Sequence, residues 1–199
     1  MAERKAKLTR QTKETQVDVE INLDGTGESS IDTPNGMFNH LLEQLARHGL
    51  LDISVSAKGD LSPGWHHLVE DVAIVLGQCI HQAIGDGRGI TRMGHMAIPL
   101  DETLVLVAVD LGGRPYPVIK ATFDSDLIGD LPSDLIRHFL EVFAIEGRLN
   151  LHAQILSGIN DHHKAEALFK ALARSLRQAV AIDSRSNDEI PSTKGTIGE

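Results

Sequence analysis

Apolar and polar residues alternate along several short stretches of the chain, and a period of two is typical of a half-buried strand. The clearest stretch covers residues 12–23, where apolar side chains occupy every second position from Val17 to Leu23 and the turn signal Asp24-Gly25 follows. A short strand is also predicted near residues 30–32. Further alternating runs predict strands over residues 51–57, 93–99, 103–110, 117–123 and 149–155.

Four other segments carry apolar residues at the three- and four-residue spacing of a helix that buries one face. Glycine stands at the end of three of them, at Gly49, Gly85 and Gly147, where it favours helix termination. The pattern therefore predicts helices over residues 37–49, 66–84, 133–146 and 161–182.

The second half of the chain repeats the plan of the first. A shift of 98 residues superposes the first predicted helix on the third, and a shift of 96 residues superposes the second on the fourth. The pairs that match include His40 with His138, Glu43 with Glu141, His66 with His162, His67 with His163, and Glu70 with Glu166. Because the matches run through helix, strand, loop and helix, the sequence predicts an internal duplication.

The predicted fold is α+β and consists of two strand-strand-helix-strand-helix units, over about residues 9–90 and 91–185. Each unit is expected to form a mixed sheet of about four strands with two helices on one face. Both units are expected to belong to a single domain that spans residues 1–199.

Composition narrows the class of protein. With 199 residues, of which 41% are hydrophobic and 24% charged, the chain can form one compact domain and is unlike a disordered or fibrous polymer. The net charge of −9 argues against a general nucleic-acid binder. A single cysteine, Cys79, excludes an internal disulfide and suits a reducing compartment. The apolar runs are too short for a membrane span and residues 1–10 lack the apolar core of a secretory signal, so we expect a cytoplasmic protein.

Two copies of His-His-x-x-Glu, at the starts of the second and fourth predicted helices, are the strongest chemical signal. Residues four apart share a helix face, so His66 and Glu70 can bind one cation together, whereas His67 points about 100° away. Imidazole with carboxylate suits Mn, Fe, Zn or Ni better than Mg or Ca. The candidate ligands are His40, His66, His67, Glu70, His138, His162, His163 and Glu166.

These eight groups divide evenly into two sites of three histidines and one glutamate. Helical geometry and the pseudo-twofold relation of the halves favour two sets: His66, Glu70, His138 and His163 for one ion, and His40, His67, His162 and Glu166 for the other. The ligands of one site can come from different subunits.

Other interpretations of these histidines, without a catalytic metal site, compete with this one. A histidine outside the pairs, such as His48, His81 or His95, is more often solvated or hydrogen-bonded than a metal ligand, and one His-His pair alone is usually fortuitous. Folding gives no reason to keep the whole module twice, which favours a metal site. Two other metalloproteins stay open: a dinuclear hydrolase, which would use more aspartate ligands, and a non-catalytic metal store.

Seven longer motifs run in order along nearly the whole chain: residues 10–15, 23–27, 38–49, 66–71, 110–115, 160–166 and 191–195. They resemble the motifs of imidazoleglycerol-phosphate dehydratases, the manganese enzymes of histidine biosynthesis. The chain departs from that family at Asn39, Leu68 and Gly112, where Asp, Thr and Ser are usual or common, and in the loop 61–65, which is less acidic. None of these departures removes a candidate ligand, although they could alter the groups that tune the metals.

The resemblance implies a lyase that dehydrates imidazole glycerol phosphate to imidazole acetol phosphate. Two Mn²⁺ ions per active site would stabilise an imidazolate and a diazafulvene-type intermediate. Proton transfer is assigned to Glu14 and Glu166 and contact with the leaving hydroxyl to Asp101, while the identity of the base stays open. The resemblance also implies that the helices of both halves pack between the two sheets. Trimers are expected to join into a shell of twenty-four subunits, with active sites at subunit contacts.

The phosphate of such a substrate needs cations and hydroxyls in an otherwise acidic chain. The residues that fit by type are Arg92, Arg114, Ser192, Thr193 and Lys194. The resemblance adds Gln44, His48 and Lys170 to this phosphate pocket, and it also assigns Glu14 to the substrate site. We therefore expect a C-terminal tail, residues 190–195, that orders around phosphate against a neighbouring subunit.

Overall fold

The computed structural model describes residues 3–59, 64–186 and 188–197. Of the helices in these ranges, none combines the length and apolar character that a bilayer crossing needs. The elements are β1 (Lys5–Gln11), β2 (Thr15–Asn22), β3 (Ser29–Asp32), α1 (Gly36–Gly49), β4 (Asp52–Gly59), α2 (His66–Ile84), β5 (Met93–Leu100), β6 (Thr103–Asp110), β7 (Tyr116–Lys120), β8 (Leu127–Ile128), β9 (Leu131–Pro132), α3 (Asp134–Glu146), β10 (Asn150–Ser157) and α4 (Asp161–Val180).

The longer strands form two four-stranded mixed sheets of the same design. Their orders are β1-β2-β4-β3 and β5-β6-β10-β7. In each sheet the last pair, β3 with β4 or β7 with β10, is parallel and the other pairs are antiparallel. The short strands β8 and β9 make a separate hairpin. This architecture confirms the predicted α+β fold with two mixed sheets.

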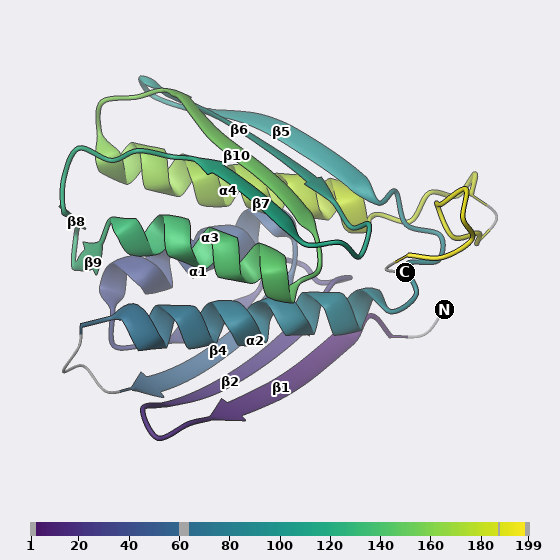
Figure 1. The fold of residues 1–199 in the computed structure, drawn as a ribbon, viewed down its shortest axis with the longest axis horizontal. Helices are drawn as coiled ribbons and strands as arrows, with labels where there is room; N and C mark the ends of the chain where they lie inside the picture. The colour runs from purple at the N-terminus through teal and green to yellow at the C-terminus, as the bar shows by residue number, and fades with distance from the viewer. Residues whose placement is uncertain (1–2, 60–63, 187, 198–199) are drawn as a thin grey trace.

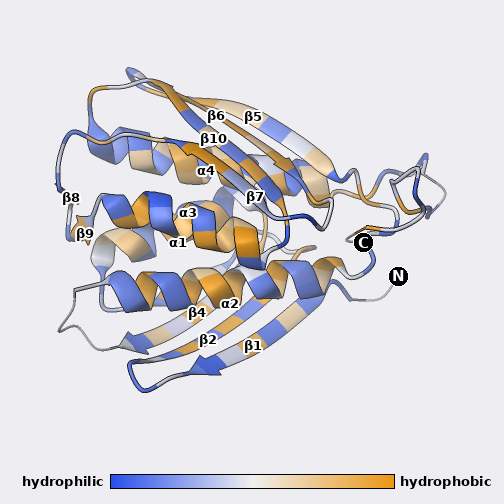
Figure 2. Ribbon diagram, viewed as in Figure 1, coloured by the Kyte–Doolittle hydropathy of each residue, from blue (hydrophilic) through white to orange (hydrophobic). Residues whose placement is uncertain are grey.

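The four helices lie between the two sheets, as the sequence resemblance implied (Figure 1). Helix α4 packs against β5 and β6, α2 packs against β1 and β2, and the helices contact each other in the pairs α1–α4 and α2–α3. Apolar and polar residues alternate along β2 (Figure 2), and its inward side chains Val17, Val19 and Ile21 are at most 1% exposed. Burial of apolar surface, at about 25 cal/mol per Å², holds the layers together.

Strand β1 is the main difference from the predicted fold. The first half has three strands before its first helix, one more than the predicted unit, and the additional strand is β1; the second half has three sheet strands and the β8–β9 hairpin before α3. It lies at the edge of its sheet, and of its seven residues only Ala6 is buried. Lysine and arginine occupy three of its five exposed positions, as is common on edge strands, so its sequence shows no extended apolar alternation.

The N-terminus of α1 is fixed to the second half of the chain. The carboxylate of Asp130 accepts hydrogen bonds from the backbone N–H groups of Gly36 and Met37, at 2.8 Å each. An acidic group at this end satisfies unpaired donors and opposes the positive end of the helix dipole. The contact sets the position of α1, and with it His40, relative to the second half.

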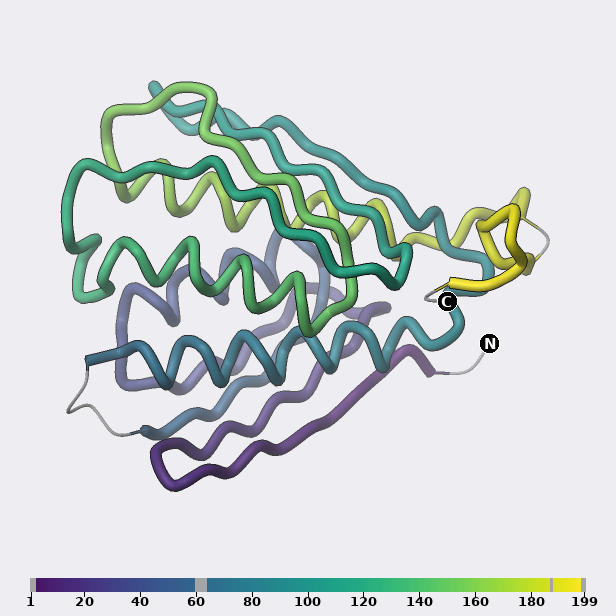
Figure 3. The backbone as a smooth tube through the Cα atoms, in the orientation of Figure 1, coloured from purple at the N-terminus to yellow at the C-terminus, as the bar shows by residue number. Residues whose placement is uncertain are grey.

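Helices α2 and α4 both begin at one end of the helical layer and finish at the other (Figure 3). The residues that follow α4 lie at the end where α2 finishes. The chain therefore presents the His-His pairs, at the helix starts, and the C-terminal tail at opposite ends.

Candidate metal centre

The starts of the helices position the paired histidines. Helix α2 begins at His66, and α4 begins one residue before His162. Asn160 caps α4, because its side-chain oxygen accepts the backbone N–H groups of His162 and His163 at 2.9 and 3.3 Å. The first turn of α4 therefore has a fixed start, which aims its two imidazoles in fixed directions.

One group of metal-binding side chains, here the His40 cluster, consists of His40, His162 and Glu166. One donor atom of each lies within 4.8 Å of the others. The Oε2 atom of Glu166 lies 2.9 Å from His40 Nε2 and 3.1 Å from His162 Nε2. The two imidazole rings stack with centroids 5.4 Å apart. Contact between α1 and α4 thus brings together side chains from the two halves of the chain.

Lys170 completes the surroundings of Glu166. Its ammonium nitrogen lies 2.5 Å from Glu166 Oε1, one helical turn along α4. Burial raises the pKa of Glu166, but the hydrogen bonds from Lys170 and His40 outweigh that effect and lower the pKa to about 2. The Glu166 carboxylate is therefore negatively charged at neutral pH and can act as a metal ligand.

A second group, here the His66 cluster, consists of His66, Glu70 and His138. One donor atom of each again lies within 4.8 Å of the others. The rings of His66 and His138 stack with centroids 4.6 Å apart, and His138 Nε2 lies 3.4 Å from Glu70 Oε1. This cluster is the counterpart of the His40 cluster, built where α2 contacts α3.

The donor set fits a transition-metal ion. His138 Nε2 is buried and has no hydrogen-bond partner among the described residues. A buried polar nitrogen without a partner costs free energy, which a ligand with an empty orbital would relieve. Neutral imidazoles with one carboxylate in each cluster match the preferences of Mn, Fe, Zn or Ni.

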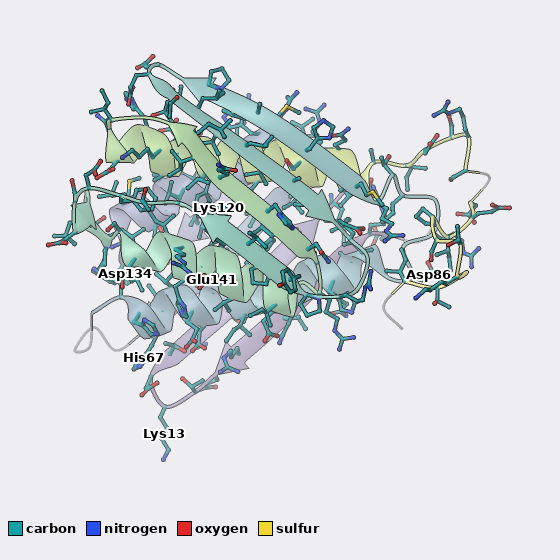
Figure 4. All side chains as sticks on the ribbon, turned by 45° about the horizontal axis from the view of Figure 1, so that its top comes forward. Lys13, His67, Asp86, Lys120, Asp134 and Glu141 are labelled. Carbon is teal, nitrogen blue, oxygen red and sulfur yellow. The ribbon has the colours of Figure 1, made fainter. Side chains whose placement is uncertain are left out.

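The second histidine of each pair lies outside these clusters. His67 Nδ1 is 3.4 Å from Glu14 Oε2, and Figure 4 shows His67 at the end of the molecule that carries Lys13 in the β1–β2 turn. His163 Nδ1 is 2.9 Å from Glu102 Oε2. The structure therefore brings together three members of each predicted ligand set, and within one chain the fourth faces elsewhere.

Two of the three predicted catalytic carboxylates, Glu14 and Asp101, lie beside these outlying histidines. Glu14 is about half exposed next to His67. Asp101 is 76% exposed, adopts a left-handed backbone conformation with φ of 48°, and places Oδ2 3.8 Å from His163 Nε2. The third, Glu166, lies within the His40 cluster.

The predicted substrate-binding residues fall into two groups. Gln44 and His48 follow His40 at four-residue intervals along α1, and Lys170 follows Glu166 along α4, so these three extend from the His40 cluster. Burial lowers the pKa of His48, and the nearby Lys170 lowers it further. The other group lies with the C-terminal tail.

A polar cavity of about 540 Å³ contains that second group. Its lining includes Arg92, Arg114, Ser192, Thr193 and Lys194. Arg92 forms a two-point ion pair with Asp110, Nε to Oδ1 at 2.7 Å and Nη2 to Oδ2 at 3.0 Å, and its Nη1 donates to the carbonyl of Pro191 at 2.9 Å. Arg92 thus holds the tail in place, while the side chains of Arg114 and Lys194 carry the cavity's other positive charges.

Departures from the family pattern have local structural roles. Asn39 accepts from the Thr33 hydroxyl at 2.6 Å and fastens the end of β3 to α1. Leu68 is fully buried in the core. A Cβ at Gly112 would lie 2.9 Å from Arg92 Nη2, so the glycine leaves room for the ion pair. The predicted change in the loop 61–65 falls largely on residues 61–63, outside the described residues.

Glu102 and Asp71 are two further residues with such contacts that were not predicted from the sequence. Glu102 contacts His163, and its pKa is held well below the usual range by the backbone N–H of Asn160 and by His163. Asp71 is buried and accepts from Arg10 Nε at 2.7 Å and from the Thr15 hydroxyl, which ties the β1–β2 hairpin to α2. The signal for Glu102 was its place directly before a strand that repeats β2.

Comparisons with known proteins find relatives along nearly the whole chain. A model of the imidazoleglycerol-phosphate dehydratase family matches residues 33–176. A protein of that name from Dehalococcoides mccartyi is 53% identical over 197 residues, with 99% of each chain covered. One from Methanothermobacter thermautotrophicus is 50% identical over 194 residues, with 98% of each chain covered.

Two solved structures have the same fold. The dehydratase from Staphylococcus aureus has a TM-score of 0.82 and 35% identity, over 90% of this chain and 99% of that chain. The enzyme from Pyrococcus furiosus, in complex with (S)-C348, has a TM-score of 0.81 and 33% identity, over 96% of this chain and 100% of that chain.

Proposed function

The chain belongs to the imidazoleglycerol-phosphate dehydratase family, and on that premise we propose that it is a manganese-dependent hydro-lyase of histidine biosynthesis. It removes water from imidazole glycerol phosphate and yields imidazole acetol phosphate. The observation that carries the proposal is the pair of equivalent three-donor clusters, His40 with His162 and Glu166, and His66 with Glu70 and His138. We place the reaction in the cytoplasm, in agreement with the single, buried cysteine.

Two Mn²⁺ ions would supply Lewis acidity at the ring nitrogens of the substrate. Each cluster would hold one ion. One further histidine would complete each site, and it would come from the His-His pair that contributes no other ligand to that site. His163 completes the His66 cluster and His67 completes the His40 cluster. Because both histidines face away from these clusters within one chain, we propose that the completing residue comes from a neighbouring subunit.

Dehydration also needs a group that takes the proton from the carbon next to the ring. We propose the carboxylate of Glu14, which is about half exposed beside His67 and is free of a salt bridge to lysine or arginine among the described residues. Glu166 is less suited as a base, because Lys170 and His40 hold its charge. We propose that Asp101, exposed beside His163, contacts the leaving hydroxyl; the hydroxide and the proton taken from the carbon together make up the water that is lost.

We propose that the cavity at the C-terminal tail binds the phosphate of the substrate. The side chains of Arg114 and Lys194 offer charge, and Ser192 and Thr193 offer hydroxyls. The 19 residues of α2, at ~1.5 Å each, separate His66 from this end of the molecule by roughly 28 Å. A glycerol phosphate cannot span that distance, so we propose that one subunit's tail meets the clusters of another.

This arrangement supports a proposal about assembly. We propose trimers that join into a shell of twenty-four subunits, with the active sites at the contacts. Metal that binds the assembled state stabilises it by mass action. Light scattering before and after chelation should record a loss of mass together with a lower Tm. A metal-free protein that keeps its full mass and its Tm would contradict the coupling.

The internal repeat supports the same proposal. Residues 9–90 and 91–185 are proposed as pseudo-repeats, with the substrate-binding tail at 190–195, in one domain. The matched sheet orders support this division. A duplicated subunit offers two similar clusters to two ions, as a ring with two nitrogens requires.

A direct assay tests the function. The purified chain, stripped of metal and reloaded with Mn²⁺, is expected to form imidazole acetol phosphate, which a spectrophotometric assay detects. Formation should cease on chelation and resume on addition of Mn²⁺. Release of inorganic phosphate without this product would instead support a dinuclear hydrolase, and metal uptake without turnover would support a metal store.

A further inference from the structure

Glu14 and Glu102 occupy equivalent positions in the two halves of the chain. Each directly precedes a buried threonine, Thr15 or Thr103, that begins the second strand of a hairpin. The sheet registers agree over most of the strand length, because Val17 pairs with Ala57 as Val105 pairs with Ile155, and only beyond this point does β10 shift its register. Each glutamate also lies beside Nδ1 of the second histidine of its own half.

The carboxylate of Glu102 is fully engaged. Its Oε1 accepts the backbone N–H groups of Ile159 and Asn160 at 3.0 and 2.8 Å and the Thr103 hydroxyl at 3.1 Å. Its Oε2 lies 2.9 Å from His163 Nδ1. Because both backbone groups are obligate donors, Oε1 is fixed as their acceptor and Oε2 is left to face the imidazole.

Among the residues that the structure describes, the Glu14 carboxylate has no comparable set of partners. Its Oε2 lies 3.4 Å from His67 Nδ1, and that nitrogen has no hydrogen-bond partner among the described residues. Glu14 is 53% exposed, which leaves its carboxylate accessible to a substrate. The two equivalent glutamates are therefore held differently, one in a network and one open.

We propose that Glu102 is a positioning residue that keeps the proton of His163 on Nδ1, so that the Nε2 lone pair faces a metal ion. This inference rests on the proposed function, in which His163 completes a metal site. An ionised carboxylate only accepts hydrogen bonds, so the nitrogen that faces it must carry the proton. The other nitrogen is then bare, as a metal ligand has to be, and the ring cannot rotate without loss of this bond.

The variant Glu102→Gln tests the assignment sharply. A glutamine has one acceptor oxygen, and the N–H groups of Ile159 and Asn160 require it. The amide NH₂ must then face His163 Nδ1 and donate to it, which moves the ring proton to Nε2 and blocks the ligand position. Thr103→Val is the matched control, because it removes a donor to Oε1 and leaves the contact of Oε2 with His163 in place.

Three measurements on the full chain separate positioning from structural support. Titration with Mn²⁺ against a competing chelator should give Glu102→Gln about a 10- to 100-fold loss of affinity for one of two ions. Thr103→Val should bind both ions as the wild type does, and the Tm of metal-free Glu102→Gln should stay close to that of metal-free Thr103→Val. In ¹⁵N-histidine spectra of the metal-free chain, one histidine should change its tautomer in Glu102→Gln.

The outcomes are distinct. Wild-type affinity for both ions in Glu102→Gln, or an affinity loss that only follows a lower metal-free Tm, would overturn the assignment of Glu102 alone. An unchanged tautomer would do the same. A wild-type chain that binds no Mn²⁺ would overturn the proposed function and this assignment together.

Discussion

His40 Nε2 lies 2.9 Å from Glu166 Oε2, although 126 positions separate the two residues in the sequence. Each comes from a different half of the chain, and the counterpart contact between His138 and Glu70 also crosses from one half to the other. Neither half alone can therefore assemble a three-donor cluster. Metal binding should depend on the packing of the four helices as much as on the ligands.

Replacement of His40 by glutamine should remove one donor from the His40 cluster. We expect the Mn²⁺ content after gel filtration to fall and activity to fall at least ~100-fold, more than the loss typical of a residue that only supports a ligand. His95→Gln is the control, since His95 is exposed on β5 outside both clusters. Equal metal content in the two variants would contradict the assignment of His40.

Lys194→Ala should weaken substrate binding through the phosphate. A charge-assisted hydrogen bond is worth about 1.5–3 kcal/mol, and ~1.4 kcal/mol corresponds to a tenfold change, so KM should rise roughly tenfold or more. Steady-state kinetics measure this, with Lys7→Ala as the control because Lys7 is exposed on β1 and pairs with Glu20. If KM stays unchanged in a folded Lys194→Ala protein, the tail does not belong to the site.

Gly94→Ala should destabilise the contact between β5 and α4. An added Cβ would clash with the backbone carbonyl of Ser175 and lie 3.0 Å from Ala179 N. Such overpacking costs about 1–3 kcal/mol, which denaturant unfolding of the metal-free protein would reveal. At Gly36 the same change meets its nearest atom at 3.5 Å, so Gly36→Ala should leave the free energy of unfolding nearly unchanged.

Asp52 should make stability depend on pH at the acid end. Burial alone would raise the pKa of Asp52. Hydrogen bonds from the backbone N–H groups of Thr26 and Glu28 and from other nearby donors outweigh that effect, so the pKa is lowered overall. A lowered folded-state pKa stabilises the fold above the unfolded value of ~3.9, and the contribution disappears as pH falls through the folded-state pKa.

Asp52→Asn should therefore be less stable than the wild type at neutral pH, by about 1 kcal/mol. The two unfolding curves should converge in acid, because the wild-type carboxylate is then protonated. A stability difference that is the same at neutral and acid pH would show that the charge of Asp52 plays no part.

Elements with strong periodicity could be predicted from the sequence nearly to the residue. The predicted helix 66–84 and strand 103–110 coincide with α2 and β6, because each buries one continuous face or alternates without interruption. Strand β1 could not be predicted in this way, since an edge strand with one buried residue leaves no such pattern. Its place depends on pairing with β2, which is a property of the folded sheet.

The contacts within the candidate site show the same difference between local pattern and folded structure. The pairing of His66 with Glu70 follows from their four-residue spacing on a helix, which a sequence displays directly. The neighbours of His163 do not, because Glu102 reaches it from a hairpin 61 positions away. Only the equivalence of the residues before Thr15 and Thr103 could have pointed to Glu102, and that requires the hairpins to be aligned as well as the helices.

The separation between the His-His pairs and the C-terminal tail has a genetic consequence. Figure 4 shows His67 at one end of the molecule and Asp86, close to the tail, at the other. If each active site combines the clusters of one chain with the tail of another, a substitution at one end and a substitution at the other end affect parts of the site that different subunits contribute. An allele altered at His66 and an allele weakened by a change at Lys194 should then complement each other when co-expressed, because some mixed contacts unite an intact cluster with an intact tail.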